Sequence, residues 1–379
     1  MTVTTESALA EAIAGAQGPL RVRGGGTRDI GRPTAGDLLK VAITGVELYE
    51  PAALTLVVGA GTPLAEVTTL LAGEGQRLAF EPMDHRVLLG TEGVPTIGGV
   101  VAANVSGPRR IQAGAARDHA LGMRFVDGAG RVLKNGGRVM KNVTGYDLVK
   151  LLAGSWGTLG VITELSLKVQ AVPETEATLI VRGLALEQGV SALARALGSP
   201  YDVTGAAHLG FDGGTTLVRI EGLQGMVDHR AGALLEDGFA GWERIDAAAS
   251  AALWADVRDV APFAGSDRPV WRVSLKPTDA PGFAAALEAA GLSHRGIFDW
   301  GGGLAWLELE TTAQDAGAAT VRAALAAVGG HATLVRGAPE VRSSIDVFQP
   351  QSAPVTALTR ALKQKFDPRG VLNPGLMGV

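Results

Sequence analysis

Residues 96–107 read TIGGVVAANVSG, and this stretch decides how the rest of the chain is interpreted. A turn of small residues opens into the apolar run Val100–Ala103 and breaks at Asn104. Side chains this small allow a backbone to approach a ligand closely, and consecutive N–H groups can then face an anion. Gly-rich turns are common, so the stretch gains weight from two further Gly-rich segments, at 24–26 and 154–160. We expect all three segments to line one bound dinucleotide.

The composition indicates a protein of two or three domains without a nucleic-acid surface. A chain of 379 residues is longer than one core ordinarily organises. No uninterrupted apolar run reaches the roughly 18 residues of a membrane-spanning helix, and residues 1–17 have the pattern of an amphipathic helix rather than an export signal. The net charge is −4 with no block of Lys and Arg, and there is no Cys. The missing Cys excludes disulfides, thiolate metal sites and cysteinyl-linked cofactors, and it fits a reducing, cytoplasmic compartment.

Residues 20–28 predict a strand that runs directly into a glycine loop. Leu20–Arg23 has the composition of a short strand, and GGGTR follows at 24–28. A strand that ends in three glycines can wrap its N–H groups around a phosphate, and a plain turn is the alternative. The later Gly59-Ala60-Gly61 does not make a nicotinamide-binding fingerprint, because Leu64 stands where the third glycine belongs.

Hydrophobic periodicity and turn residues predict the other elements up to residue 173. We expect strands at 38–41, 54–59, 78–80, 120–126, 131–133 and 161–169. We expect helices at 6–16, from Pro63 onward and at 148–152. Polar residues predict a connection at 47–51, and an irregular connection is expected at 82–95, where Asp84 and His85 are interpreted as a solvated pair.

The composition changes after Pro173, and strand-like and helix-like runs then alternate, which predicts a sheet covered by helices. The strand-like runs are 178–181, 216–220, 270–275, 304–309 and 332–335, and the helix-like runs are 189–197, 226–239, 280–290 and 313–327. WGGG at 300–303 predicts a hairpin turn. Near the end of the chain we expect a helix whose apolar side holds Leu358, Leu362 and Phe366. The turn at 367–375 contains two prolines and two glycines, so it should dock onto another part of the protein.

Four motifs in this order resemble the FAD-binding family of p-cresol methylhydroxylase and vanillyl-alcohol oxidase type. They are RGGGTR at 23–28, TIGGVVAANVSG at 96–107, TGYDLVKLLAGSWGTLGVITELSLKV at 144–169 and FDPRGVLNPG at 366–375. Within the family, RDHALGMRFVDGAG at 117–130 and VMKNVTGYD at 139–147 most resemble the FAD-binding E-type subunits of bacterial glycolate oxidases.

The resemblance implies an α+β protein: a two-subdomain FAD-binding domain at 1–173, an inserted α+β cap at 174–337 and a C-terminal segment at 338–379 that packs back on the FAD domain. It implies that the first glycine loop and the central stretch hold the pyrophosphate of FAD, and that the backbone at Ile162 reaches the cofactor's other end. The implied FAD-binding residues are Arg23, Gly24, Gly25, Gly26, Thr27, Arg28, Thr96, Gly98, Gly99, Asn104, Ser106, Gly107, Gly154, Gly157, Gly160 and Ile162. Next to the flavin ring we expect Lys141, Asn142 and Asn373.

Three departures from the family pattern bear on function. Some relatives attach the flavin through a His in the first loop, but Thr27 stands there, so the FAD should be non-covalent. Many relatives that oxidise 2-hydroxy acids carry an acidic residue where this chain has Trp156, and a Glu-His metal motif that this chain lacks. We therefore expect no metal. The remaining histidines are interpreted as structural or exposed: His208, His229, His294 and His331.

The resemblance favours a FAD-binding subunit of a glycolate oxidase (glycolate dehydrogenase) complex that takes part in electron transfer during oxidation of glycolate, a small 2-hydroxy acid, to glyoxylate. A second flavoprotein and an iron–sulfur subunit would be its partners, and any membrane association would be made through them. The alternatives are a self-sufficient FAD-dependent alcohol, 2-hydroxy-acid or lactone dehydrogenase, and a non-catalytic scaffold. A self-sufficient enzyme needs a general base beside the flavin, and the sequence identifies none.

Overall fold

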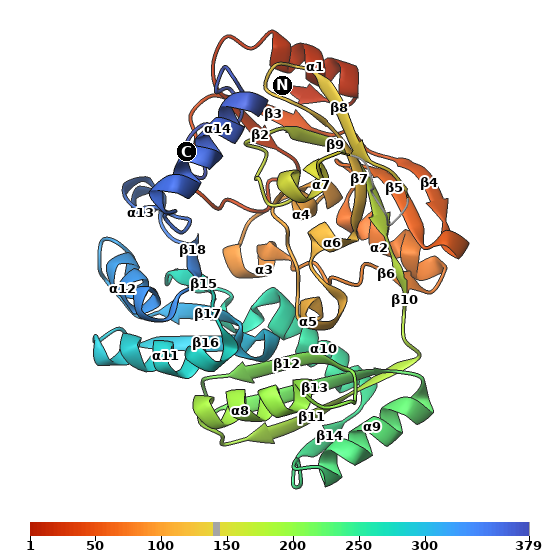
Figure 1. Ribbon diagram of the computed structural model, residues 1–379, viewed down its shortest axis with the longest axis vertical. Helices are drawn as coiled ribbons and strands as arrows, with labels where there is room; N and C mark the ends of the chain where they lie inside the picture. Colours follow the sequence, from red (N-terminus) through yellow and green to blue (C-terminus); the bar gives the residue numbers. More distant parts are fainter. Residues whose placement is uncertain (139–144, 379) are drawn as a thin grey trace.

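The computed structural model describes residues 1–138 and 145–378 of the chain, and Figure 1 shows an N-terminal part above a lower, sheet-based part. A small parallel sheet in the upper part has the strand order β1-β3-β2, with β1 (Thr2–Val3), β2 (Leu20–Arg23) and β3 (Asp37–Val41). Helix α1 (Glu6–Ala14) packs on it through Leu9 and Ile13. The Thr5 side chain caps this helix by accepting the Ala8 N–H.

A second, antiparallel sheet forms the core of the N-terminal part. Its strand order is β4-β5-β9-β7-β8, with β4 (Val46–Glu50), β5 (Thr55–Gly59), β7 (Ala120–Val126), β8 (Val132–Gly136) and β9 (Val161–Lys168). The helices of this part are α2 (Leu64–Gly73), α3 (His85–Leu89), α4 (Ile97–Ala102), α5 (Arg110–Ala113), α6 (Ala116–His119) and α7 (Leu148–Leu152). Leu56, Ile97 and Phe125 are fully buried between sheet and helices. A separate two-strand pair joins β6 (Gln76–Arg77) to β10 (Gln170–Ala171).

Residues 175–336 build an eight-stranded antiparallel sheet of order β14-β11-β13-β12-β16-β17-β15-β18. Its strands are β11 (Thr175–Arg182), β12 (Val203–Leu209), β13 (Thr215–Gly222), β14 (Glu243–Ile245), β15 (Val270–Ser274), β16 (His294–Asp299), β17 (Leu304–Leu309) and β18 (His331–Arg336). Four helices lie on the outer face, namely α8 (Leu186–Leu197), α9 (Gln224–Glu236), α11 (Ala280–Ala289) and α12 (Ala318–Val328). The other face receives α10 (Ala247–Asp259) and the N-terminal part (Figure 1). We propose 174–337 as the cap domain on this basis.

The C-terminal segment contains α13 (Pro339–Ser344) and α14 (Ala353–Phe366) and then returns to the first sheet. The Leu20 N–H donates to the Val371 carbonyl at 2.8 Å, and the Asn373 N–H donates to the Leu20 carbonyl at 3.0 Å. The buried Asp367 carboxylate accepts from the Val371 and Leu372 N–H groups and from Lys363 Nζ. The turn at 367–375 therefore lies against β2.

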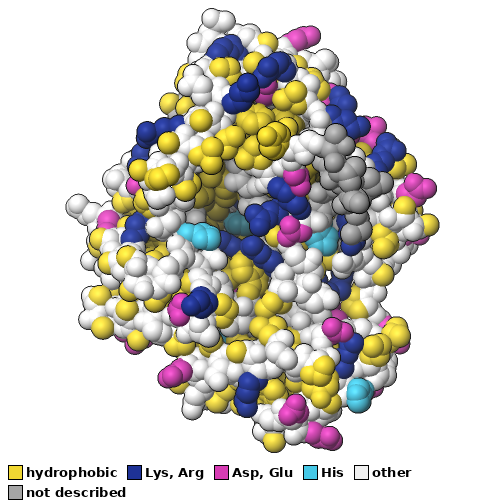
Figure 2. Space-filling model, in the orientation of Figure 1, with side chains coloured by type: hydrophobic (Ala, Val, Ile, Leu, Met, Phe, Trp, Pro, Cys, Tyr) yellow, Lys and Arg dark blue, Asp and Glu magenta, His cyan; other side chains and the backbone are white. Residues whose placement is uncertain are grey.

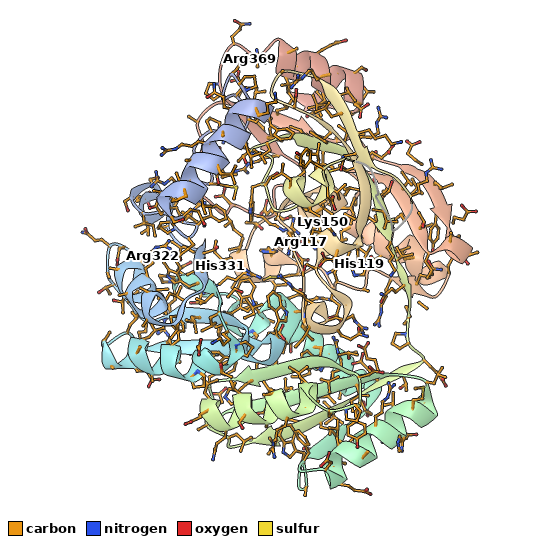
Figure 3. All side chains as sticks on the ribbon, in the orientation of Figure 1. Arg117, His119, Lys150, Arg322, His331 and Arg369 are labelled. Atoms are coloured by element: carbon orange, nitrogen blue, oxygen red, sulfur yellow. The ribbon has the colours of Figure 1, made fainter. Side chains whose placement is uncertain are left out.

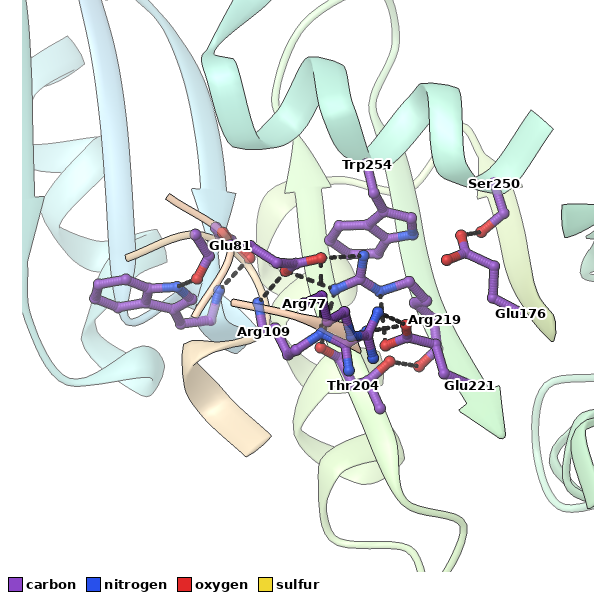
Figure 4. Close-up of polar contacts among 12 residues, drawn as sticks. Arg77, Glu81, Arg109, Glu176, Thr204, Arg219, Glu221, Ser250 and Trp254 are labelled. Atoms are coloured by element: carbon purple, nitrogen blue, oxygen red, sulfur yellow. Dashed lines mark hydrogen bonds and ion pairs between the residues drawn. The ribbon is translucent and has the colours of Figure 1, made fainter. Parts of the chain in front are cut away.

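A buried cluster of charges joins the cap to the N-terminal part (Figure 4). Arg219 on β13 donates two hydrogen bonds of 2.9 Å to the Glu81 carboxylate, which also accepts the Arg109 N–H at 2.8 Å. In the opposite direction across the boundary, Arg77 and Arg109 of the N-terminal part donate hydrogen bonds to the Glu221 carboxylate on β13 of the cap. Carboxylates and guanidiniums thus alternate across the boundary, so each charge is paired with one from the opposite side.

Several sequence predictions were wrong for identifiable reasons. The polar residues 47–51 belong largely to β4, an edge strand whose exposed side carries its charges. Residues 78–80 are buried but form no strand, and 82–95 contain helix α3. Strands β12, β14 and β16 and the Ala-rich α10 were not anticipated. On α14 the expected apolar side is not buried, because Leu358 is 62% exposed.

The prediction of a hairpin turn at 300–303 agrees with the structure, in which these residues connect the antiparallel β16 and β17.

Candidate functional site

The three glycine-rich segments line one cavity of about 830 Å³, a volume that includes space open to solvent. The end of β2 and the loop that follows it contribute all of the residues from Arg23 to Arg28. The central stretch contributes Thr96, Gly98 and Gly99, and the third segment contributes Gly157, Gly160 and Ile162. Segments far apart in the sequence therefore meet at a single concavity, here called the first cavity.

A second, larger cavity adjoins the first between the N-terminal part and the cap. Its volume is about 1360 Å³ including open space, and Ala103 and Trp156 line both cavities. Figure 2 shows a hollow near the centre of this face with Lys, Arg and His side chains around it. The other four predicted FAD-binding residues line this second cavity: Asn104, Ser106, Gly107 and Gly154. Asn104 and Ser106 also accept backbone N–H groups of Arg117 and Ala116.

Close backbone packing explains why the first cavity needs glycine. A Cβ atom added to Gly25 would lie 1.6 Å from the Val94 carbonyl oxygen, and one added to Gly98 would lie 2.6 Å from both the Cβ and the carbonyl oxygen of Ala60. Thr96 is the N-cap of α4, and its side chain accepts the Gly99 N–H at 3.2 Å. The glycines thus let the first loop and α4 lie close to their neighbours, and this packing forms the walls of the concavity.

Arg28 supplies a buried positive charge to the first cavity. Its Nε donates to His85 Nδ1 at 3.3 Å, while its Nη2 is buried and has no hydrogen-bond partner among the described residues. Burial lowers the pKa of Arg28 to about 10, so the guanidinium stays charged at neutral pH. Burial and the Arg28 charge hold the pKa of His85 well below its usual range. A pyrophosphate would satisfy this unpaired donor, so the residues present fit an FAD.

His85 and Asp84 do not form the solvated pair that we expected. His85 is buried and lies against Arg28, and Asp84 caps α3 by accepting the Arg86 N–H. No local signal indicated this arrangement, because a single His after an Asp has no periodic or motif context. His85 also lines the second cavity, so it lies between the buried guanidinium and that space.

Asn373 ties three segments together. Its Oδ1 accepts the Val22 N–H at 2.7 Å, and its Nδ2 donates to the Trp156 carbonyl at 2.9 Å. It lines neither of the two cavities, so a place beside the flavin ring stays a prediction. The other two expected ring neighbours, Lys141 and Asn142, lie outside the described residues.

The second cavity contains charged groups that sequence reasoning missed. Arg110 comes from α5, Arg272 from β15 and Asp299 from the end of β16. Burial raises the pKa of Asp299 to about 7, and its Oδ1 accepts the Trp300 N–H at 2.7 Å. Arg117 and His331, which also line the cavity, lie on its two sides in Figure 3. These residues share no sequence motif, and only the docking of the cap brings them together.

The other histidines differ in their surroundings. His208 is buried, bonds to Thr216 Oγ1 through Nδ1 at 2.9 Å, and has a pKa lowered to about 4 by burial, so it is structural as expected. His331 is exposed as a residue but faces the second cavity. Within residues 1–138 and 145–378 no three His, Asp or Glu side chains gather in a way that could hold a metal ion.

Comparison with known proteins gives concordant matches. The FAD binding domain family matches residues 1–136. Glycolate oxidase subunit GlcE of Escherichia coli is 36% identical over 363 residues, which cover 95% of this chain and 92% of that protein. Glycolate oxidase subunit GlcD of Bacillus subtilis is 40% identical over 102 residues, or 27% of this chain and 21% of that protein. The solved structure of alkyldihydroxyacetonephosphate synthase shares the fold, with a TM-score of 0.69 and 16% identity over 99% of this chain and 75% of the other.

The fold and the first cavity define an FAD-dependent oxidoreductase with a p-cresol methylhydroxylase-type FAD-binding domain. The chain belongs to the flavoprotein family of glycolate oxidase subunit GlcE. The α+β fold, the family and FAD as the cofactor, which we predicted from the sequence, are thereby confirmed. In the described part of the chain, no helix has both the length and the apolar character that crossing a membrane requires.

Proposed function

We propose that this chain is the FAD-binding subunit of a glycolate oxidase complex and takes part in electron transfer while glycolate is oxidised to glyoxylate. The similarity to GlcE, which spans 92% of that protein, carries the proposal. The partial match to GlcD supports a second flavoprotein of related fold as a partner. An iron–sulfur subunit completes the proposed complex, because one-electron carriers link a flavin to an acceptor chain.

The chain's own residues are assigned to holding the cofactor. Arg28 and the backbone of residues 24–26 and 96–99 would bind the pyrophosphate, and residues 160–162 would line the far end of the same cavity. Bound FAD supplies the redox chemistry, while the protein sets its orientation and electrostatic surroundings. Thr27 stands where some relatives carry the His that links the flavin, so treatment with acid should release all flavin from the denatured protein into solution.

A self-sufficient 2-hydroxy-acid dehydrogenase is the second candidate. The buried Asp299 favours it, because a carboxyl group in the cavity next to the FAD site could accept the proton of a substrate hydroxyl. The first candidate places oxidation in the assembled complex, so the two differ in whether the isolated chain turns over.

The test is to co-express the tagged chain with the GlcD-type and iron–sulfur proteins of the same genome, purify it, and measure dye reduction by glycolate. We expect the chain alone to be yellow and inactive, and the co-purified complex to be active. A complex that assembles and oxidises glycolate at full rate without this chain would refute the proposal. Glycolate-dependent reduction of the isolated chain's flavin would favour the second candidate.

A further inference from the structure

Two guanidinium groups from opposite sides of the domain boundary meet in the second cavity. Arg110 of the N-terminal part lies 4.4 Å from the centroid of the Trp300 ring, and Arg272 of the cap lies 5.4 Å from the same centroid. Trp300 is fixed in turn, because its Nε1 donates to the Gly107 carbonyl at 3.0 Å. One indole thus holds both cations in place.

Neither cation has a carboxylate partner in the described part of the chain. No ion pair or side-chain hydrogen bond joins Arg110 or Arg272 to a described residue, although both side chains are at least half buried. Burial and the Arg110 charge lower the pKa of Arg272 to about 10, and Asp299 in the same cavity only partly opposes this shift. Partial desolvation where it faces the cavity, together with the Arg272 and Arg110 charges, lowers the pKa of His331. Two like charges kept together in a cavity are electrostatically unfavourable until an anion lies between them.

The FAD pyrophosphate does not account for this pair. Its proposed cation is Arg28, which lines the first cavity, whereas Arg110 and Arg272 line only the second. Leu304 and Trp306 add an apolar and an aromatic surface to the second cavity, beside charged residues such as Asp299 and His331. Planar guanidinium forks match a carboxylate in shape and charge, and an apolar wall suits the small organic group attached to it.

We propose that the second cavity binds a small carboxylate, held by Arg110 from the FAD-binding part and Arg272 from the cap. The inference rests on the proposed function in one respect, since it assigns the carboxylate end of the 2-hydroxy acid to this chain rather than to a partner. It goes beyond that function because it needs neither the partners nor turnover.

Asp299 gives the site a pH dependence with a definite sign. The charges of Glu81, Arg219 and Arg272 act on its pKa, and its Oδ1 accepts the Trp300 N–H. Burial raises the pKa of Asp299 to about 7, so the group is neutral below that pH and negative above it. A negative Asp299 repels a bound carboxylate, so binding should weaken as pH rises through 7, by up to about tenfold per pH unit.

The test uses the purified full-length chain with FAD bound and oxalate, a carboxylate that resembles glycolate but has no hydroxyl to oxidise. Calorimetry and the flavin absorption spectrum should both report oxalate binding to the wild type. Arg272→Met and Arg110→Met should each weaken it about tenfold or more, because each removes charge-assisted hydrogen bonds. Arg182→Met, which changes an exposed arginine at the end of β11, should leave it unchanged.

Asp299→Asn should make oxalate affinity independent of pH between 6 and 8, and phosphate should bind more weakly than oxalate. Circular dichroism and FAD content confirm that each variant is folded.

Two results would overturn the site: no oxalate binding in the wild type, or unchanged binding in both folded arginine variants. An unaltered pH profile in Asp299→Asn would overturn the role of Asp299. If oxalate binds as expected while the assembled complex fails to oxidise glycolate, the proposed function fails alone. If the complex works without oxalate binding to this chain, only this inference fails.

Discussion

At the scale of single residues, Gly25 shows how the absence of one methyl group shapes the FAD site. An added Cβ would lie 1.6 Å from the Val94 carbonyl oxygen, so the first loop or its neighbour must move. Such overpacking costs about 1–3 kcal/mol, and we expect Gly25→Ala to bind FAD roughly tenfold or more weakly. The ratio of flavin absorbance to protein absorbance after dialysis measures the loss.

Gly18→Ala is the matched control for this change. Gly18 precedes the same strand, and an added Cβ there would meet nothing within 4 Å. The control should retain full flavin content. Equal flavin content in Gly25→Ala and Gly18→Ala would contradict the role given to the first loop.

Arg28 provides the second residue-scale prediction. We expect Arg28→Met to weaken FAD binding by about 10- to 100-fold, since a hydrogen bond to a charged group contributes roughly 1.5–3 kcal/mol. Arg21→Met is the control, because Arg21 lies on β2, just before the loop that carries Arg28, and its Nε donates only to the Gly36 carbonyl. Titration of the two apoproteins with FAD, followed by flavin fluorescence, gives both dissociation constants. Comparable constants in the two variants would remove Arg28 from the pyrophosphate site.

At the scale of elements, the turn after α14 is held by one buried carboxylate. Asp367 accepts from two backbone N–H groups and from Lys363 Nζ, and Lys363 also donates to the Thr158 carbonyl in the third glycine segment. Removing one partner of a buried pair costs about 3–5 kcal/mol. We expect Asp367→Ala to lower the free energy of unfolding by about that amount, measured by urea denaturation, and to reduce flavin content.

Asp256→Ala is the matched control, because Asp256 is an exposed aspartate on α10 with no hydrogen bond from its side chain among the described residues. It should unfold within about 0.5 kcal/mol of the wild type. If Asp367→Ala unfolds at the same urea concentration as this control, the turn is not held in the way described.

The elements around the first cavity could be predicted from sequence because their signals are local. Glycines and short alternating strands identify β2 and β9 without knowledge of distant contacts, whereas the short helix α4 stands where only a turn and an apolar run were expected. The second cavity could not be predicted, since Arg110, Arg272 and Asp299 stand at unremarkable places in a short helix and two strands. Helix α10 was missed for a related reason: its Ala-rich start has no apolar stripe, and Trp254 becomes buried only by packing against β12.

At the scale of the whole molecule, the charge cluster between cap and N-terminal part predicts acid sensitivity. Burial alone would raise the pKa of Glu81, but Arg219 and Arg109 outweigh it and hold the pKa below its usual value of 4.5. A lowered pKa stabilises the folded state above pH 4.5, and that contribution disappears as pH falls through the folded value. We expect Glu81→Gln to lower the free energy of unfolding by roughly 3 kcal/mol at pH 7.

The same difference should shrink as pH falls below 4, because the wild-type carboxyl is then protonated as well. Urea unfolding curves across this pH range test the expectation. Glu288→Gln, at an exposed position on α11, is the control and should match the wild type throughout. A difference between Glu81→Gln and wild type that stays constant in acid would show that the charge of Glu81 is not the cause.

Asn373 stands far along the chain yet ties Val22 to Trp156 at the edge of the FAD cavity. During synthesis on the ribosome, the glycine loop emerges hundreds of residues before the amide that braces it. A nascent polypeptide therefore carries an incomplete cofactor pocket until translation has passed residue 373. We therefore expect flavin loading to be a late step, so that chains ending before residue 373 remain colourless.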